Sequence, residues 1–368
     1  MTAIGMRNRA GLWLPVLMLW VGLAVAGLLP VGTAQAQNFQ GMLNRFIKAE
    51  ELPGGVLLVS GPSGRNVVAA GVADRDAGTP MTTRSRFYVA SVGKMATAVA
   101  TLQLVEEGRL SFDAPVGGMV GTLPVDRIAN VRTATLQQVL THTSAIPDYL
   151  NERFSAASSE RPDHVWTAAE LLAFARGQKP PGKPGQVYDY SNSNYVLLGH
   201  VVETADGVPF AQALHRRIFD RAGMTATTVG AGNAKDPTLA HGYTEEDGDV
   251  SSYSWTAVTG DGPLVTTAED LERFALALFR EGLLLSPSMV ERMKTPTDLE
   301  TGYAMGLEIW EDRWGTAYGH TGSYDGFESE VRYYPDRQTV LVFLTNGNQV
   351  TDTDILDKAA AAVFATAN

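Results

Sequence analysis

The order of strand-like and helix-like segments is the feature that most constrains the fold. Two short β-rich segments lie near the start of the chain, at 56–60 and 66–71, and a Gly-Pro-Ser-Gly turn at 61–64 joins them. Four more strand-like segments follow residue 301, whereas helix-like patterns separated by Pro/Gly loops occupy about 111–296. We therefore expect the two ends of the chain to share one sheet and the middle to form a separate helical lobe, with a cleft between them as the natural site.

The periodic segments define the expected elements. Helices are predicted at 38–50, 136–140, 168–175, 195–205, 210–222, 268–280 and 352–365. The late strands are predicted at 303–310, 316–321, 327–334 and 339–345. Thr267, followed by Glu269 and Asp270, is typical of a capped helix N-terminus. These segments predict an α/β fold in which an antiparallel sheet is flanked by helices from both chain ends and joined to a mainly helical lobe.

A serine and a lysine stand at the start of a long helical pattern in residues 86–110. Ser91 and Lys94 are three residues apart, so on one helix they share a face and lie within side-chain reach. Apolar residues recur behind them, and Gly108 is placed to cap the C-terminus, which predicts an amphipathic, buried helix. Serine becomes a good nucleophile when a base removes its proton, and desolvation lowers the pKa of a lysine toward about 7 to 8. Because S-x-x-K is short enough to arise by chance, it needs support from other motifs.

Two further constellations suit the expected cleft. In the loop at 184–195, Tyr190 and Asn192 are placed to present a phenol and an amide on the same side. A phenol can shuttle a proton, and an amide can hold a substrate amide carbonyl. On the predicted strand at 319–323, an imidazole and a hydroxyl stand beside Gly322, where backbone can approach a ligand closely. That strand edge is suited to an extended substrate.

Three ordered motifs carry a family resemblance: Ser91-x-x-Lys94, Tyr190-Ser191-Asn192 and His320-Thr321-Gly322. Together they resemble the penicillin-recognising serine hydrolases, in particular the class C β-lactamase-like group. That group includes D-Ala-D-Ala carboxypeptidases with H-T-G in place of K-T-G, D-aminopeptidases and related esterases. The resemblance extends from about Phe39 to the C-terminus, with supporting stretches at 140–144, 265–271 and 319–327. It implies a β-lactamase/transpeptidase-like fold.

The resemblance also implies a mechanism. Ser91 would be acylated, Lys94 would be its partner base, and Tyr190 would relay the proton to the leaving group. Hydrolysis of the acyl-enzyme would follow. No metal or organic cofactor is implied.

The substrate-binding residues implied by the resemblance are Asn192, His320, Thr321, Gly322 and Ser323. Asn192 would hold the substrate amide, and the third motif would line the substrate side. The backbone N–H of Ser323, together with that of the nucleophile, would form the oxyanion hole. His320 replaces a lysine, so the cation that many β-lactamases use there is absent or pH-dependent, which argues against efficient β-lactam hydrolysis.

Several residues depart from the pattern or imitate it. Ala145 stands where relatives commonly have glycine, and His142 is interpreted as structural. A second Y-x-N at 149–151 lacks the Pro-Gly lead-in of the first and is interpreted as a loop of the helical lobe. The remaining histidines lack the spacing of a zinc site, and no G-x-S-x-G motif is present.

The N-terminal segment 1–36 is typical of a secretory signal, with two arginines, an apolar run at 12–29 and an A-x-A site ending at Ala36. A membrane anchor through 12–29 is the alternative. The chain contains no cysteine, which excludes a lipoprotein anchor, disulfides and thiolate metal sites. A net charge of −11 and the absence of a basic run argue against a nucleic-acid partner.

We expect a signal peptide at 1–36 and one β-lactamase-related domain at 37–368, in which about 37–90 and 300–368 form the sheet lobe and about 91–299 the helical lobe. The expected protein is an exported, periplasmic or secreted serine hydrolase. D-alanyl-D-alanine carboxypeptidase or D-amino-acid peptidase activity is the first choice, carboxylic-ester hydrolysis the second and β-lactam hydrolysis the third. A non-catalytic receptor for peptidoglycan fragments is the alternative from another class. The partner is a small-molecule or peptide substrate, peptidoglycan-derived ones included, and a membrane only if the signal segment is retained. The physiological substrate and the oligomeric state are left open.

Overall fold

The computed structural model describes residues 31–230, 236–253, 259–262, 264–348, 350 and 354–365. Most of the expected signal segment lies outside these ranges. The first helix, α1 (Val31–Ala49), begins before the helix predicted at 38–50 and ends one residue short of it. No helix among the described residues is long and apolar enough to cross a membrane.

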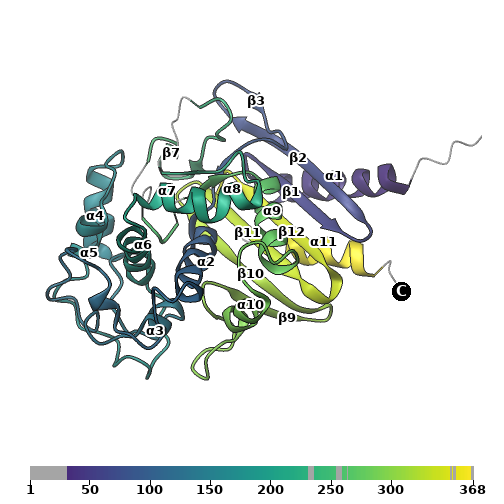
Figure 1. Ribbon diagram of the computed structural model, residues 1–368. Helices are drawn as coiled ribbons and strands as arrows, with labels where there is room; N and C mark the ends of the chain where they lie inside the picture. The colour runs from purple at the N-terminus through teal and green to yellow at the C-terminus, as the bar shows by residue number, and fades with distance from the viewer. Residues whose placement is uncertain are drawn as a thin grey trace, which may run out of the picture.

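An antiparallel sheet of seven strands forms the centre of the described chain, in the order β3-β2-β1-β12-β11-β10-β9. The strands are β1 (Gly54–Gly61), β2 (Gly64–Asp74), β3 (Thr79–Pro80), β9 (Glu308–Asp312), β10 (Gly315–Tyr324), β11 (Phe327–Tyr334) and β12 (Thr339–Thr345). β1 pairs with β12, so that Gly55 lies opposite Thr345. The two ends of the chain therefore share one sheet, as the sequence predicts (Figure 1).

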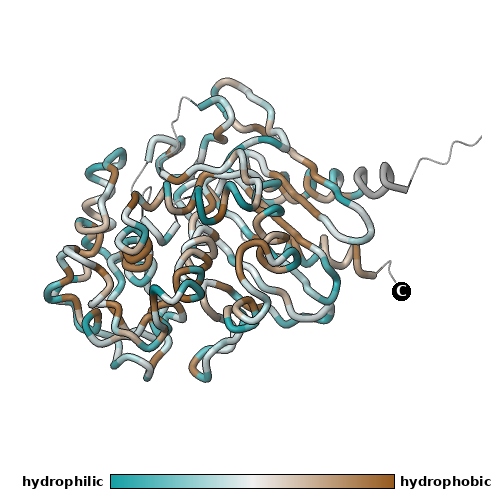
Figure 2. The backbone as a smooth tube through the Cα atoms, in the orientation of Figure 1, coloured by the Kyte–Doolittle hydropathy of each residue, from teal (hydrophilic) through white to brown (hydrophobic). Residues whose placement is uncertain are grey.

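Both faces of the inner strands are buried, because their alternate residues enter two different cores. Val56 and Leu58 belong to the larger core shared with the helical half of the molecule, whereas Leu57 and Val59 pack into the smaller one. The smaller core is closed by α1 and by α11 (Ile355–Phe364). Figure 2 shows hydrophobic residues gathered along the inner strands and the helices beside them, with hydrophilic loops at the rim.

The other helices lie between the two strand-rich ends of the sequence. They are α2 (Gly93–Glu106), α3 (Leu136–Leu140), α4 (Glu152–Glu160), α5 (Ala168–Ala173), α6 (Asn192–Asp206), α7 (Phe210–Leu214), α8 (Asp220–Ala222), α9 (Ala268–Phe279) and α10 (Pro287–Lys294). Capping residues begin several of them: Thr135 and Thr167 form capping boxes, and the predicted cap Thr267 accepts a hydrogen bond from Asp270 N. The short helices α4 and α10 were not predicted.

The remaining short strands are β4 (Phe87–Tyr88), β5 (Thr228–Val229), β6 (Tyr243–Thr244), β7 (Gly248–Asp249) and β8 (Leu264–Thr266). β4, β8 and β5 form a small sheet. Since β4 ends three residues before Ser91, this sheet helps to fix the course of the chain into the first motif.

The prediction that the S-x-x-K helix is amphipathic is wrong. The helix α2 is buried along its length from Gly93 to Leu104, and even Lys94 has no exposed surface. The reason is its position, since α2 lies between the sheet and the helices around α6 (Figure 1). The predicted cap is confirmed: Gly108 has a φ of +71° and its N–H donates to Val105 O.

The strand predicted at 303–310 is only partly present, because β9 begins at Glu308. Gly306 has a φ of +73°, which is incompatible with a strand, and the chain turns beneath α2 at this point. A Cβ on Gly306 would lie 2.6 Å from Ala98 Cβ and 2.9 Å from the Tyr195 hydroxyl. This close packing places Tyr303, which precedes the turn, in the interior.

Candidate active site

Ser91 lies in a short 3-10 turn, Ala90–Val92, directly before α2. Ala90 has a φ of +45°, a left-handed conformation that is costly for alanine and that must be held by its surroundings. Ser329 Oγ donates to Val89 O at 2.8 Å, and a Cβ on Gly322 would lie 2.3 Å from that same oxygen. The turn is therefore fixed against β10, and it presents Ser91 to a cavity.

Lys94 is buried beneath Ser91 and has a full set of acceptors. Its Nζ lies 2.9 Å from Ser91 Oγ, 2.8 Å from Asn192 Oδ1 and 2.6 Å from Asp261 O. These contacts suit both protonation states, since an ammonium donates three hydrogen bonds. A neutral amine donates to Asn192 and Asp261 and turns its lone pair toward the Ser91 hydroxyl, as a general base requires.

Two acidic residues, the half-buried Asp148 and the buried Asp261, lie near this lysine on the helical side. Asp148 accepts hydrogen bonds from Asn192 N and Nδ2, at 3.1 and 2.9 Å. Asp261 Oδ2 accepts from the Tyr149 hydroxyl at 2.6 Å. Burial raises the pKa of Asp148, while the hydrogen bonds from Leu150 and Asn192 act in the opposite direction. Asp148 thereby holds Asn192 in place beside the nucleophile.

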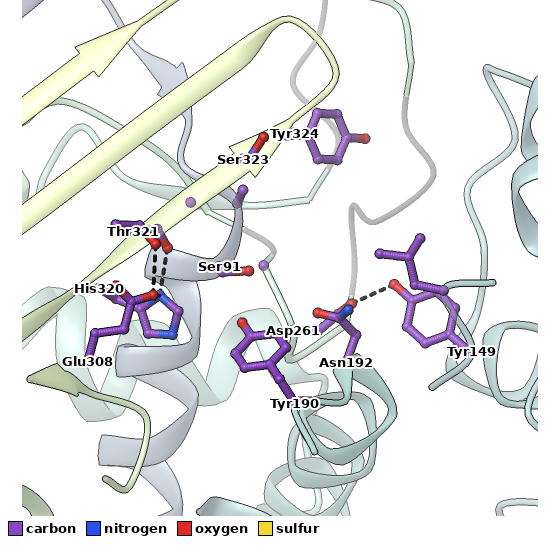
Figure 3. A pocket seen from close by; sticks show the side chains of 14 residues that line it. Ser91, Tyr149, Tyr190, Asn192, Asp261, Glu308, His320, Thr321, Ser323 and Tyr324 are labelled. Carbon is purple, nitrogen blue, oxygen red and sulfur yellow. Dashed lines mark hydrogen bonds and ion pairs between the residues drawn. The ribbon is translucent and has the colours of Figure 1, made fainter. Parts of the chain in front are cut away.

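Tyr190 completes this side of the site. Its hydroxyl points toward Ser91 (Figure 3), and Lys94 Nζ lies 5.1 Å from the centre of its ring. We refer to the four side chains gathered here as the acyl-transfer cluster: Ser91, Lys94, Tyr190 and Asn192. They come from separate parts of the chain, and the structure brings them together as the motifs predict.

His142 lies behind Tyr190, where the two rings stack at 4.2 Å. Its Nδ1 accepts a hydrogen bond from Ser191 N at 3.1 Å and lies 3.1 Å from Asn194 Nδ2. Burial lowers the pKa of His142 well below its usual value, and the nearby Lys94 acts in the same direction. His142 is therefore a neutral support for the second motif, in line with its structural interpretation.

Two residues outside the three motifs, Tyr303 and Glu308, contact His320 of the third motif. His320 Nδ1 lies 2.6 Å from the Thr321 carbonyl oxygen and 3.2 Å from Glu308 Oε1. Because both of these oxygens accept hydrogen bonds, Nδ1 carries the ring proton. In the neutral ring, Nε2 then accepts from the Tyr303 hydroxyl at 3.2 Å. Burial lowers the pKa of His320, although Glu308 opposes this. Both ring nitrogens of His320 thus have partners, and the imidazole is neutral, so it supplies no cation. We call Glu308, His320 and Thr321 the edge-strand wall (Figure 3).

The cavity-facing part of β10 is a strand edge. Among the described residues, β9 pairs with β10 only from Gly315 to Gly319. Beyond Gly319 the same edge carries Thr321, Gly322 and Ser323, all of which line the cavity. The backbone approaches the nucleophile closely at this edge, because a Cβ on Gly322 would lie 3.1 Å from Ser91 N. The oxyanion role of the Ser91 and Ser323 N–H groups stays a prediction that this placement accommodates.

A cavity of about 280 Å³ connects these groups. Its lining includes residues that the sequence analysis did not assign to the site: Ala90, Tyr149, Leu150, Asp261, Gly262, Glu308 and Tyr324. Tyr149 was missed because its Y-x-N was dismissed as a loop. That interpretation holds for Asn151, whose Oδ1 caps α4 by accepting from Arg153 N and Phe154 N. In the described part of the chain, no group of three His, Cys, Asp or Glu side chains is arranged to hold a metal ion.

Sequence and structure comparisons relate the chain to known proteins. The family model described as Beta-lactamase matches residues 39–366. The chain is 31% identical to the penicillin-binding protein PbpX of Bacillus subtilis (strain 168) over 75% of its own length, and it spans 66% of that protein. It is 28% identical to penicillin-binding protein 4 of Amycolatopsis lactamdurans, with 82% of each chain covered. Among solved structures, a D-stereospecific amidohydrolase from Streptomyces sp. matches with a TM-score of 0.77 and 28% identity, covering 91% of this chain and 99% of the other.

Proposed function

The chain belongs to the β-lactamase family of serine hydrolases, and we propose that it is a D-amino-acid peptidase or amidase acting through an acyl-enzyme on Ser91. The observation that carries this proposal is that Lys94 Nζ hydrogen-bonds to both Ser91 and Asn192, and that these two residues line the cavity beside the β10 edge. Similarity to the Streptomyces D-stereospecific amidohydrolase supports the choice of substrate class. D-alanyl-D-alanine carboxypeptidase activity is the nearest alternative.

The proposed reaction starts at the serine hydroxyl. Ser91 Oγ attacks the amide carbonyl carbon while its proton passes to Lys94 Nζ, 2.9 Å away. The carbonyl oxygen gains negative charge and is bound by the backbone N–H groups of Ser91 and Ser323. The C–N bond then breaks as the proton held by Lys94 passes through the Tyr190 hydroxyl to the leaving nitrogen, so that Lys94 is neutral again and the amine departs. This leaves an ester on Ser91.

Water completes the cycle by adding its hydroxyl to the acyl carbon and returning a proton to Ser91 Oγ. Asn192 holds the scissile amide during acylation, and it is itself held by Asp148. Tyr190 is favoured over His320 as the proton relay, since both ring nitrogens of His320 already have partners. No metal takes part in these proposed steps.

The test is intact mass spectrometry of the protein after brief exposure to p-nitrophenyl acetate, D-alanine p-nitroanilide and a fluorescent penicillin. Wild type should gain an acyl mass from at least one of them, and Ser91→Ala should gain none and lose kcat by up to about a millionfold. Ser159→Ala, which changes an exposed serine on α4, is the matched control and should behave as wild type.

The probes also separate the related activities. A long-lived penicillin adduct confined to Ser91 favours a D-Ala-D-Ala carboxypeptidase. Fast ester turnover without a penicillin adduct favours an esterase or D-aminopeptidase. A Ser91→Ala variant that keeps a tenth of the wild-type activity would sink the assignment, and failure of every probe to acylate Ser91 would favour a receptor.

Export is part of the proposal and rests on the N-terminal sequence. Residues 1–36 have the composition of a secretory signal, with the expected cleavage near Ala36. Expression of the full chain, followed by mass measurement of the protein in the periplasmic and membrane fractions, tests it. A mature mass that begins near residue 37 supports cleavage, whereas an intact N-terminus in the membrane fraction supports the anchor.

A further inference from the structure

The wall of the cavity opposite the helical lobe carries a carboxylate. Glu308 opens β9 and lines the cavity, with about 24% of its side chain exposed. Its Oε1 accepts a hydrogen bond from Thr321 Oγ1 at 2.7 Å and lies 3.2 Å from His320 Nδ1 (Figure 3). These two contacts fix the carboxylate beside the substrate edge.

This carboxylate has no full positive charge to balance it within the described part of the site. The ion-pair contact of Glu308 there is with His320, whose pKa is lowered by burial, so its imidazole is neutral at neutral pH. Lys94 directs its Nζ at Ser91, Asn192 and Asp261. Lysine and arginine are absent from the described lining. The wall therefore presents negative charge to whatever enters.

Resting on the proposed function, we infer that Glu308 is a specificity residue that makes the cavity select substrates with a free α-ammonium group and disfavour those with a carboxylate at the same position. A cation beside Glu308 supplies the missing charge, whereas a second carboxylate meets like-charge repulsion in a partly desolvated site. The chemical class is a D-aminoacyl amide or ester whose amino group is unblocked.

The distances along β10 are consistent with this position. Gly322 is where the strand passes Ser91 N, and Thr321, the partner of Glu308, is one residue earlier, about 3.3 Å along the strand. An α-amino group is separated from the scissile carbonyl by a single carbon atom. In the proposed orientation, a carbonyl held at Ser91 has its amino group on the side of the edge-strand wall.

The closing experiment compares three p-nitroanilides that differ only at the amino group: D-alanine, N-acetyl-D-alanine and N-succinyl-D-alanine p-nitroanilide. Wild type should prefer the free amine, and Glu308→Gln should lower the ratio of kcat/KM for the free amine over the N-acetyl substrate by about tenfold. It should also raise the relative rate on the succinyl substrate. The ratio is the readout, so a general loss of activity cancels.

Glu311→Gln is the matched control, because Glu311 lies on the same strand and also accepts from a β10 threonine, Thr316, but does not line the cavity. It should leave the ratio at the wild-type value. A Glu308→Gln ratio within twofold of wild type would overturn the inference.

A binding measurement separates this inference from the proposed function. In a Ser91→Ala background, titration calorimetry with D-alaninamide and N-acetyl-D-alaninamide reports amine preference without turnover. Glu308→Gln should weaken binding of the free amine by about tenfold and leave the acetylated ligand nearly unchanged. If wild type acylates with none of the anilides, the proposed function fails, while this titration still decides the role of Glu308: equal binding of both ligands by both proteins refutes it.

Discussion

The acyl-transfer cluster and the edge-strand wall face the same cavity but are built in opposite ways. In the cluster, motif residues bind one another, and the half-buried Asp148 and the buried His142 hold them from behind. In the wall, the motif residue His320 is closed off by Tyr303 and Glu308, which belong to no motif. We therefore propose that the cluster determines which reaction occurs and that the wall determines which substrates react.

The largest effect is expected at the centre of the cluster. Lys94→Ala removes the proposed base and leaves Asn192 Oδ1 and Asp261 O without their shared donor. We expect kcat to fall by about 10⁴-fold for amine, acetyl and ester substrates alike, measured by steady-state kinetics. Lys358→Ala, on the exposed surface of α11, is the control. A loss confined to one substrate class would contradict the assignment of the reaction to the cluster and of substrate choice to the wall.

Tyr190→Phe should slow acylation by about 10²- to 10³-fold, because it removes the hydroxyl that points toward Ser91 and keeps the ring stacked on His142. The measurement is the pre-steady-state acylation rate with D-alanine p-nitroanilide, accompanied by a thermal unfolding curve. Tyr188→Phe changes a neighbouring phenol that does not line the cavity and should leave the rate unchanged. Unchanged kinetics in Tyr190→Phe would move the relay to another group.

Gly306→Ala tests the turn that packs against α2 and leads into Glu308. Its φ is +73°, and a Cβ would lie 2.6 Å from Ala98 Cβ, so we expect a loss of about 2–4 kcal/mol in the free energy of unfolding. Gly78→Ala is matched in backbone, with a φ of +64°, but a Cβ there meets nothing within 4 Å. It should cost about 1 kcal/mol by denaturant titration. Equal losses would mean that backbone strain, and not packing beneath α2, decides the effect.

The smallest effect concerns the support behind Tyr190. The pKa of His142 is lower in the folded protein than in the unfolded chain, so below about pH 6.5 the unfolded chain binds a proton that the folded protein does not. His142 therefore contributes stability above that pH, which is lost as the pH falls. We expect the unfolding free energy of wild type minus that of His142→Asn to be smaller by about 1.4 kcal/mol at about pH 5.5 than at about pH 7.5.

This measurement has to be a difference between variants. Burial raises the pKa of both Glu328 and Glu330 to about 7 in the folded protein. As the pH falls through the same window, the folded protein therefore binds these protons before the unfolded chain does, which stabilises the fold. A pH-independent difference for His142→Asn would contradict a buried neutral imidazole.

Much of the fold was predictable because its signals are local. The hairpin of β1 and β2, the limits of α3, β11 and β12 and the Thr267 cap follow from strand alternation, helical periodicity and turn chemistry. The family resemblance and the fold class are likewise confirmed. The strand predicted from residue 303 failed because a single left-handed glycine, Gly306, overrides the β-rich pattern around it.

The sequence by itself predicted the proposed reacting groups, because the spacing of Ser91 and Lys94 is a property of the chain over three residues. Only the tertiary structure decided which residues stand beside the predicted His320 and Thr321 in the wall of the cavity. Glu308, Tyr303 and Tyr149 reach the site through turns whose course depends on contacts with distant residues, such as the packing of Gly306 against α2 and the bond of Tyr149 to Asp261. Local periodicity carries no information about such contacts, so the charge of the substrate wall appears only once the chain is folded.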